Sequence, residues 1–402
     1  MNFLPYGRQN LDEDDIGAVV EVLRSDFLTS GPQVEAFERE FAAMVGAKHA
    51  IVVCNATAAL HLAMLVGRIG KGHRVVTSPN TFLASANCAA FVGAVPDFAD
   101  IHSVSYNLDP GSLEANWKSD TKVVVAVDYA GQPADMPAIA EVARKRGALV
   151  VQDACHGAGG AFIHNDKTWK LGAHPWADIT IFSFHPVKTM TTGEGGMLVT
   201  DDEEYARKAR LLRTHGMERD QSRFVGLGAA PGSQLSEIGP WSYEMQELGY
   251  NFRITDLQCA LGRSQLRKLP RFIKRRQEIV ARYNAAFDGL PHIAIPRVQG
   301  KHAHLISWHL YTLRLDFRSL GKTRAQVMTN LREKGIGTQV LYIPVYLQPW
   351  YRLTYGYAPG KCPNAESFYT EALSIPLYPS MSDADVCRVI DSVQEIAGKM
   401  GS

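Results

Sequence analysis

The sequence predicts an α/β protein in which a large domain, built on a mainly parallel β-sheet, is followed by a smaller α+β C-terminal domain. Short apolar runs alternate with helical patterns from about residue 50 to residue 200, which is typical of parallel strands covered by helices. The chain has 402 residues, which is enough to bury a separate core in each of two domains. No G-x-G-x-x-G motif follows the first apolar run, which argues against a dinucleotide-binding domain.

The N-terminal part is expected to start with two amphipathic helices. Residues 11–24 carry apolar side chains at helical spacing, and residues 33–45 repeat that pattern after a break at Thr29-Ser-Gly-Pro32. Helical patterns such as residues 136–146 then separate a series of buried runs. We expect these runs to be strands, at residues 51–53, 74–77, 94–98, 123–127, 148–152, 179–184 and 196–200.

The C-terminal part follows a glycine- and serine-rich stretch. Residues 217–249 show little periodicity and predict either a mobile loop over the site or a surface excursion. We place the domain boundary near residue 290, so that residues 1–290 hold the N-terminal segment and the large domain and residues 291–402 the small one. The elements expected here are helices at 255–269, 270–287, 324–334 and 383–400 and strands at 308–315 and 337–343.

Composition narrows the class of protein. Lysine and arginine (42) nearly balance aspartate and glutamate (41), so the polybasic footprint of a nucleic-acid partner is missing. The six cysteines form no C-x-x-C pair, and the thirteen histidines show no metal-ligand spacing, so we expect free thiols and no metal. Residues 1–10 lack the apolar core of a signal peptide, and no apolar run reaches the ~18 residues of a membrane span. We therefore expect a cytoplasmic protein without membrane or nucleic-acid partners.

Lys188 is the first candidate catalytic residue. It lies on a short polar connection between two apolar runs, 179–184 and 196–200, and the glycines Gly193, Gly195 and Gly196 allow a tight backbone turn there. A lysine amine becomes a nucleophile when burial or neighbouring charge lowers its pKa, and it then forms Schiff bases with aldehydes. A solvated loop lysine is the alternative, and the surrounding residues decide between the two.

Asp153 and His156 supply the second part of the candidate site. Both follow the apolar run 148–152, at the carboxyl end of a predicted strand, where open α/β sheets bind ligands. Taken singly, Asp153 would serve equally well as a turn cap. Together with Lys188 it suggests pyridoxal 5′-phosphate, because the ring nitrogen of that cofactor needs a carboxylate and its aldehyde needs a lysine.

A third set of residues could hold the phosphate and the ring of this cofactor. The run 51–53 is followed by a polar turn and a helical pattern, so free N–H groups and the helix dipole would face the sheet edge. An ordinary helix start explains that turn as well. Ser183 could donate to the same anion, and Phe82 could stack on a flat ring or belong to the core.

These motifs together resemble the DegT/StrS sugar aminotransferases, pyridoxal-phosphate enzymes of fold type I, the aspartate aminotransferase class. The motifs are S-F-H-P-V-K with T-T-G-E-G-G behind it, D-A-C-H-G before it and N-A-T-A-A-L near the start. The resemblance extends over nearly the whole chain, from L-T-S-G-P-Q-V-E-A-F-E to L-Y-I-P-V-Y. Within the family, V-D-Y-A-G and S-F-H-P-V-K are most similar to the 4-aminotransferases of the pseudaminic acid pathway.

The resemblance implies a role for each site residue. Lys188 would bind the cofactor covalently, Asp153 would pair with its ring nitrogen, His156 would lie near its phenolic oxygen and Phe82 would stack on the ring. The family also forms homodimers with shared active sites. The phosphate would be held by Thr57, Ala58 and Ser183, with Asn251 reaching in from a second subunit.

The activity implied is ping-pong transfer of an amino group from L-glutamate to the C4 ketone of a UDP-linked 4-keto-6-deoxy-N-acetylhexose, in pseudaminic acid biosynthesis. Another UDP-, dTDP- or GDP-linked keto sugar is the alternative substrate, and a non-catalytic sensor that binds the cofactor is an alternative outside catalysis. A related sugar dehydratase would carry histidine in place of Lys188. The aromatic residues Tyr342, Tyr346 and Trp350 would line the substrate entrance or simply pack.

Overall fold

A computed structural model describes residues 2–226, 238–300 and 302–398. Its elements in chain order are, for the helices, α1 (Glu13–Leu23), α2 (Pro32–Val45), α3 (Ala56–Val66), α4 (Ala84–Phe91), α5 (Pro110–Ala115), α6 (Met136–Arg144), α7 (Glu203–Arg213), α8 (Asp256–Phe287), α9 (Arg324–Glu333), α10 (Pro349–Tyr355), α11 (Pro363–Glu371) and α12 (Asp383–Ile396). The strands are β1 (His49–Val53), β2 (Arg74–Thr77), β3 (Val95–Phe98), β4 (Thr121–Val127), β5 (Leu149–Asp153), β6 (Ala161–His164), β7 (Lys167–Lys170), β8 (Ile179–Ser183), β9 (Gly196–Thr200), β10 (Met217–Glu218), β11 (Glu244–Met245), β12 (Ile293–Ala294), β13 (Tyr311–Leu315) and β14 (Ala372–Ile375).

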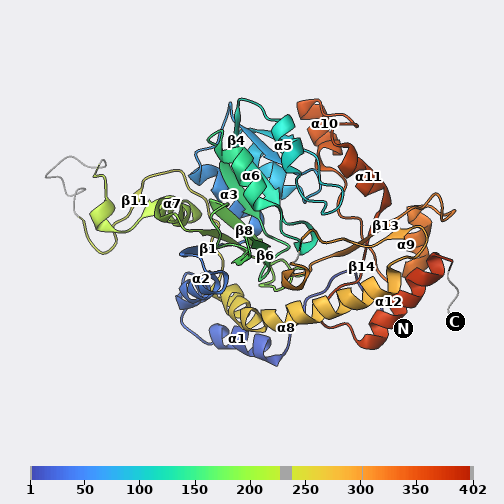
Figure 1. Cartoon of the computed structure of the whole chain (residues 1–402). Helices are drawn as coiled ribbons and strands as arrows, with labels where there is room; N and C mark the ends of the chain where they lie inside the picture. Colours follow the sequence, from blue (N-terminus) through green and yellow to red (C-terminus); the bar gives the residue numbers. More distant parts are fainter. Residues whose placement is uncertain (1, 227–237, 301, 399–402) are drawn as a thin grey trace.

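The large sheet confirms the predicted fold class. It has seven strands in the order β1-β9-β8-β5-β4-β2-β3. The strands β8, β5, β4, β2 and β3 pair in parallel, whereas β9 is antiparallel to both of its neighbours. All seven predicted runs are present as strands of this sheet, and Figure 1 shows helices on both of its faces.

Two apolar clusters cover the sheet, one on each face. Successive residues of a strand point to opposite faces, so Val52 joins the cluster that contains α2 and α6, while Ile51 and Val53 join the cluster that contains α3 and α7. On the first face, the ring of Phe41 from α2 meets that of Phe182 from β8 at 5.1 Å. Burial on both faces explains why these strands appear in the sequence as continuous apolar runs.

The long helix α8 differs from the sequence prediction. We expected two helices separated at Pro270, but residues 256–287 form one helix with this proline inside it. Proline removes one helical hydrogen bond and usually kinks or ends a helix. Here both halves are buried: Leu266 and Leu269 pack in the large-domain core, and Ile279 and Phe287 in the C-terminal one. This packing outweighs the local cost, and Figure 1 shows α8 extending from α1 and α2 to α12.

The C-terminal part contains a three-stranded sheet in the order β12-β13-β14. The predicted strand at 308–315 is confirmed as β13, but the one at 337–343 is wrong. Only Gln339 bridges to Ser374 there, because the Val340 N–H donates to the Gln339 side chain and the Leu341 carbonyl accepts from Tyr129. A boundary near residue 290 remains a prediction, and the second half of α8 shares its core with the C-terminal sheet.

The N-terminal segment packs against the C-terminal part of the chain and is hydrogen-bonded to it. Leu4 is buried in that core, its N–H donates to the Gly335 carbonyl at 2.8 Å, and its own carbonyl accepts from Gly337 at 2.7 Å. The Tyr6 carbonyl accepts from Leu377 at 3.1 Å. The first residues of the chain are therefore held by residues near its end.

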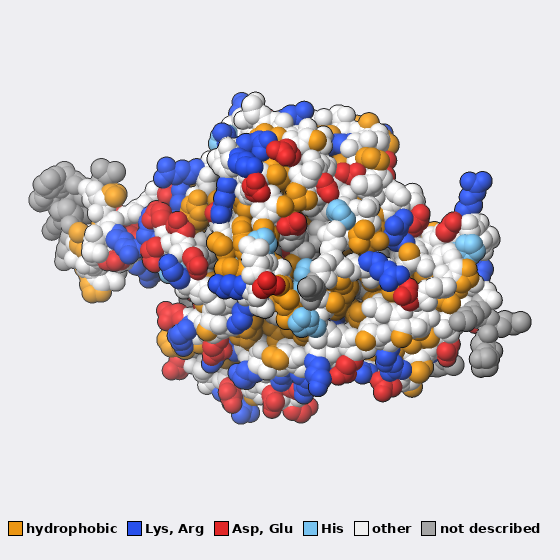
Figure 2. Space-filling model, in the orientation of Figure 1, with side chains coloured by type: hydrophobic (Ala, Val, Ile, Leu, Met, Phe, Trp, Pro, Cys, Tyr) orange, Lys and Arg blue, Asp and Glu red, His pale blue; other side chains and the backbone are white. Residues whose placement is uncertain are grey.

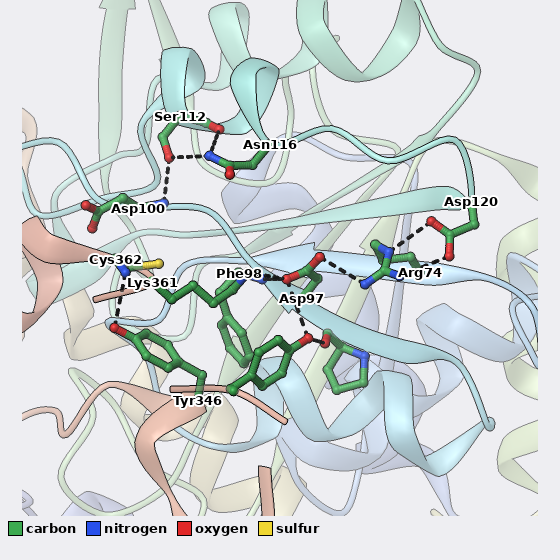
Figure 3. A network of polar contacts seen from close by, with 12 residues as sticks. Arg74, Asp97, Phe98, Asp100, Ser112, Asn116, Asp120, Tyr346, Lys361 and Cys362 are labelled. Carbon is green, nitrogen blue, oxygen red and sulfur yellow. Dashed lines mark hydrogen bonds and ion pairs between the residues drawn. The ribbon is translucent and has the colours of Figure 1, made fainter. Parts of the chain in front are cut away.

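A polar network holds residues 344–365 against β2 and β3 (Figure 3). The buried Asp97 accepts from Arg74 at 2.9 Å and pairs with Lys361 at 2.8 Å. Asp100 accepts from two backbone N–H groups in the first turn of α11, at 2.9 and 3.0 Å, and so caps that helix. These contacts fix the segment that follows Tyr342 to the edge of the large sheet.

Part of the glycine-rich stretch lies outside the described residues, namely 227–237. Its described flanks, which include the pair β10 and β11, project away from the body of the molecule (Figure 1). Elsewhere on the face drawn in Figure 2, acidic and basic side chains are interspersed, as the near-zero net charge leads one to expect. None of the helices in the described ranges combines the length and the apolar character that crossing a membrane requires.

Candidate active site

The parallel strands bring the predicted residues to one edge of the sheet. Asp128 follows β4, Asp153 ends β5 and Ser183 ends β8, and these three strands are neighbours. The Asp128 N–H donates to the Asp153 carbonyl at 3.0 Å, so the two turns are joined. The carboxyl edge of the sheet therefore carries the candidate site, as the sequence predicts.

Lys188 lies on the connection between β8 and β9. Its N–H donates to the His185 carbonyl at 2.9 Å, and Gly193 takes a left-handed φ of 82° in the same connection. A Cβ on Gly195 would lie 2.2 Å from the Thr192 hydroxyl, so the turn requires glycine there. The side chain is half-buried, and burial lowers the pKa of Lys188 although Cys155 and Asp153 oppose the shift. A lowered pKa is the property that a nucleophilic amine needs.

The carboxylate of Asp153 is buried and positioned by two hydrogen bonds, so that it can pair with a cationic group. Its side chain is only 5% exposed, Ser85 from α4 donates to Oδ2 at 2.7 Å, and the Cys155 N–H donates to Oδ1 at 3.2 Å. Each carboxylate oxygen has two lone pairs, of which these contacts use one, so the group can accept further hydrogen bonds. The protonated ring nitrogen of pyridoxal phosphate fits that remaining capacity.

His156 is a neutral imidazole in a defined tautomer. The Ala130 N–H donates to Nδ1 at 3.2 Å, so the proton sits on Nε2, which lies 3.3 Å from the Tyr342 hydroxyl. Burial and the nearby charge of Lys188 hold the pKa of His156 well below its usual value. The ring of His309 lies 4.4 Å away, centre to centre. Nε2 of His156 therefore donates, and the hydroxyl hydrogen of Tyr342 remains available to another acceptor.

The turn after β4 positions this histidine. Asp128 is fully buried and accepts from the Ala134 N–H at 2.8 Å and from Gln152 at 2.9 Å. The turn places Ala130 at a φ of 59° and Gly131 at 95°. A Cβ on Gly131 would lie 2.0 Å from the Ser307 carbonyl, so only glycine fits. The backbone turn formed by the motif V-D-Y-A-G thus directs the Ala130 N–H toward Nδ1 of His156.

Asp128 makes the stability of the protein depend on pH. Burial, with the nearby Asp153 carboxylate, raises the pKa of Asp128 to about 8. A carboxyl whose pKa is higher in the folded state stabilises the fold fully below its unfolded pKa, and this contribution is lost as the pH rises through about 8. In Asp128→Asn we expect the melting temperature to fall less than in the wild type between pH 5 and pH 8. Equal slopes in thermal unfolding at these pH values would contradict the assignment.

The phosphate end of the predicted site lies at the start of α3. Asn55 caps this helix by accepting the Ala58 N–H at 2.9 Å, so the phosphate would have to share or replace that contact. Thr57 is half-buried in the same turn, and Ser183 is buried at the end of β8. A Cβ on Gly196 would lie 2.5 Å from the Ala56 nitrogen, so β9 approaches the helix start as closely as a glycine permits.

Phe82 and Tyr342 form the open side of the site. Phe82 is 57% exposed, a large value for a phenylalanine, and its ring lies 6.3 Å from that of Tyr342. An exposed aromatic side chain three residues before Ser85, which binds Asp153, could stack on a flat cofactor ring. The residues present therefore fit pyridoxal phosphate at its ring nitrogen, its aldehyde and its ring face.

The remaining predicted residues are Asn251 and the aromatic residues expected at the substrate entrance. Asn251 is exposed, its backbone is bridged to Thr214, and in the described chain no hydrogen bond joins its side chain to the rest of the site. Of the aromatic residues expected at the entrance, Tyr342 reaches the site and Trp350 is half exposed, but Tyr346 is buried in the core. In the described ranges, no three His, Cys, Asp or Glu side chains are grouped as a metal site would need.

Sequence reasoning missed Ser85 and His309 as neighbours of the predicted residues. Ser85 donates to Asp153 from 68 positions away, and the ring of His309 lies beside that of His156, far from it in the sequence. The local signal for Ser85 is its spacing of three residues from Phe82, across the turn that leads into α4, where the Ser85 N–H donates to the Phe82 carbonyl at 3.3 Å.

The chain is similar to known proteins over nearly its whole length. The model of the DegT/DnrJ/EryC1/StrS aminotransferase family matches residues 9–394. The spore coat polysaccharide biosynthesis protein SpsC of Bacillus subtilis is 44% identical over 98% of this chain and 97% of its own. The structure is similar to that of Helicobacter pylori PseC, an aminotransferase involved in the biosynthesis of pseudoaminic acid, with a TM-score of 0.87 and 30% identity over 99% of this chain and 100% of that one.

A third relative bears on the cofactor. The PLP-form of a putative sugar aminotransferase from Streptococcus pneumoniae is similar with a TM-score of 0.86 and 28% identity over the whole of both chains. Its PMP-form matches equally well, with a TM-score of 0.87. The cofactor of this family is pyridoxal phosphate, and the residues at the carboxyl edge of the sheet are chemically suited to it. The chain belongs to the DegT/DnrJ/EryC1/StrS aminotransferase family and is a pyridoxal-phosphate-dependent sugar aminotransferase of fold type I.

Proposed function

We propose that this enzyme transfers the amino group of L-glutamate to the C4 ketone of a UDP-linked 4-keto-6-deoxy-N-acetylhexose, as a step in pseudaminic acid biosynthesis. The observation that carries the chemistry is the half-buried amine of Lys188, with its lowered pKa, at the same sheet edge as Asp153 and His156. When bound there, pyridoxal phosphate would supply an aldehyde for the amine and a ring that withdraws electrons.

Each residue has a part in both half-reactions. Lys188 would hold the cofactor through its amine, and the same amine, when free, would act as the base and acid that moves the proton of the carbon that bears the amino group. The buried carboxylate of Asp153 would pair with the ring nitrogen and stabilise its positive charge. His156 stays neutral and donates from Nε2, which orients Tyr342. In the second half-reaction the same groups act in reverse on the keto sugar.

The choice of sugar is supported by the motifs V-D-Y-A-G and S-F-H-P-V-K and by the similarity to PseC. The 44% identity to SpsC favours a second candidate, another nucleotide-linked keto sugar that supplies a polysaccharide. The two candidate reactions would use the same residues of the enzyme. They differ only in the sugar substrate.

The test is to offer UDP-linked 4-keto-6-deoxy-N-acetylhexoses of the L-arabino and D-xylo forms, with L-glutamate, and to identify the amino sugar by NMR. We expect the L-arabino ketone to be preferred and to give the 4-amino-L-altrose product. A preference for the D-xylo ketone, or for a dTDP- or GDP-linked sugar, would contradict the pathway and favour the second candidate.

We also propose a homodimer in which Asn251 completes the site of the other subunit. Asn251 is exposed, and the projecting segment beside it presents apolar side chains to solvent, including Trp241 at 66% and Leu248 at 77% exposure. Figure 2 shows hydrophobic side chains on this projection. Exposed apolar groups gathered on one projection are typical of a protein–protein interface.

Mixing inactive chains tests the shared site. Lys188→Ala and Asn251→Ala chains, unfolded and refolded together, would form heterodimers with one intact site each. Random pairing should restore about a quarter of wild-type activity. No recovery above the two parent proteins would show that both residues serve the site of one chain.

A further inference from the structure

Arg276 on α8 is a fully buried arginine to which the reaction described above assigns no role. Its relative exposure is 0%, and in the described ranges no carboxylate pairs with it. Burial lowers the pKa of its guanidinium group to about 9, so the group stays charged at neutral pH. A buried charge without a counter-ion costs stability, and an apolar side chain would fill the same core at lower cost. The role of Arg276 therefore lies in the groups that it binds.

Arg276 binds the backbone just before β13 and just after β14. Its Nη1 donates to the Leu377 carbonyl at 2.7 Å and to the His309 carbonyl at 3.2 Å. Its Nε and Nη2 have no hydrogen-bond partner among the described residues. The next residue of α8, Gln277, donates to the Ile306 carbonyl at 3.0 Å. One turn of α8 thus fixes the chain that leads into β13 by its carbonyl groups.

His309 connects this part of the chain to His156. The His309 N–H donates to the Ala130 carbonyl at 2.9 Å, and the Ala130 N–H donates to Nδ1 of His156 at 3.2 Å. The two imidazole rings lie 4.4 Å apart, centre to centre. His309 is only 4% exposed, and its Nδ1 has no partner among the described residues. His309 therefore contacts His156 by two routes, through the backbone of Ala130 and through its own ring.

The ring of His309 covers one side of the His156 ring and so keeps water from it. Burial and the nearby charge of Lys188 hold the pKa of His156 well below its usual value. Burial also holds the pKa of His309 well below its usual value, and the charges of Lys188 and Arg276 add to that effect. A nearby positive charge disfavours a further one on either ring. The titratable or charged groups that face the two rings are Tyr129, His185, Lys188, Arg276 and Tyr342.

We propose that Arg276 is a positioning residue of the active site, which holds the 308–309 backbone so that His309 covers His156 and Ala130 fixes its orientation. The proposal rests on the proposed role of His156 beside the cofactor. A guanidinium group carries five N–H donors on a rigid plane, and its charge strengthens hydrogen bonds to carbonyl oxygens. A side chain with fewer donors would hold fewer of these carbonyl groups. The charge of Arg276 also disfavours protonation of His309.

The experiment follows the imidazole nitrogens of His156 by nitrogen-15 NMR in the holoenzyme from pH 8 to pH 5, in the wild type and in Arg276→Met. The signals of His156 are those missing from His156→Asn. We expect wild-type His156 to stay neutral, with its proton on Nε2, over the whole range. In Arg276→Met the 308–309 backbone is released and water reaches the ring, so the pKa of His156 should rise toward the ordinary value of about 6.5. Arg276→Lys, which keeps the charge and can bind one carbonyl, should show a smaller rise.

The pH dependence of turnover gives a second measurement. If His156 becomes protonated in Arg276→Met, the rate relative to the wild type should be lower at pH 5.5 than at pH 8, where His156 is neutral in both proteins. A purely structural effect would lower the rate by the same factor at both pH values. The matched control is Arg275→Met, because Arg275 precedes Arg276 on α8 but pairs with the exposed Asp383 at 2.8 Å. In this control His156 should titrate as it does in the wild type.

An unchanged titration of His156 in Arg276→Met, or the same change in Arg275→Met, would overturn the proposal. If Arg276→Met does not fold, His309→Ala tests the same link, since it removes the ring that covers His156 and keeps the backbone contacts. The same rise in the pKa of His156 is then expected, and no rise would contradict the proposal. Wild-type turnover in His156→Asn would instead contradict the role of His156 in the reaction, so the two failures are distinguishable.

Discussion

Lys188→Ala is expected to lose the covalent cofactor adduct that borohydride traps in the wild type, and to turn over about 10²- to 10⁴-fold more slowly. The substitution removes both the amine that binds the cofactor and the group that moves the proton. Burial lowers the pKa of Lys188, which favours the neutral amine that both roles require.

A matched control is Lys122→Ala, which removes an exposed lysine of β4. Peptide mass mapping after borohydride treatment should find the cofactor on Lys188 in both the wild type and this control. An adduct on another lysine of the wild type, or one that persists in Lys188→Ala, would show that the amine has been misassigned.

Asp153→Asn should retain the cofactor on Lys188 but lose about 10- to 100-fold in rate, the loss expected for one hydrogen bond to a charged group. Asparagine cannot keep the ring nitrogen protonated, so the ring withdraws electrons less strongly. The reaction should slow in both half-reactions, which single-turnover absorbance with L-glutamate can follow.

Ser85→Ala provides the matched control for this substitution. It removes the hydroxyl that donates to Asp153 at 2.7 Å but leaves the carboxylate in place, so its effect should be smaller than that of Asp153→Asn. Turnover of Asp153→Asn close to that of the wild type would remove this aspartate from the mechanism.

The part of the fold that could be predicted from the sequence is the part that depends on local patterns. The strands of the large sheet are buried on both faces, so their apolar runs stand out. The placement of Lys188, Asp153 and His156 at one edge of the sheet was predictable because polar residues that follow parallel strands meet there, while their roles stay predictions. The contacts of Ser85, Tyr342 and His309 were not, since Tyr342 meets His156 across 186 positions and no local spacing encodes such a distance.

The two incorrect elements have tertiary causes. At Pro270 the local rule predicts a helix end, but two cores that lie on either side of the proline hold α8 continuous. At residues 337–343 the alternation predicts a strand, but the Leu341 carbonyl is bound by Tyr129 and the chain turns toward the active site. In both cases the deciding partner lies far away in the sequence, where a pattern over a few residues carries no information.

The attachment of the first residues to the last part of the chain has a consequence for synthesis. Leu4 pairs with residues 335–337, so its partners are translated more than 300 residues after it. At about 5–20 residues per second, this delay is roughly 15 to 70 s. Throughout that time the large sheet can assemble on the ribosome while the N-terminal segment stays unpaired and open to chaperones. The C-terminal core, which includes Leu4, can close only after residues 335–337 have been synthesised.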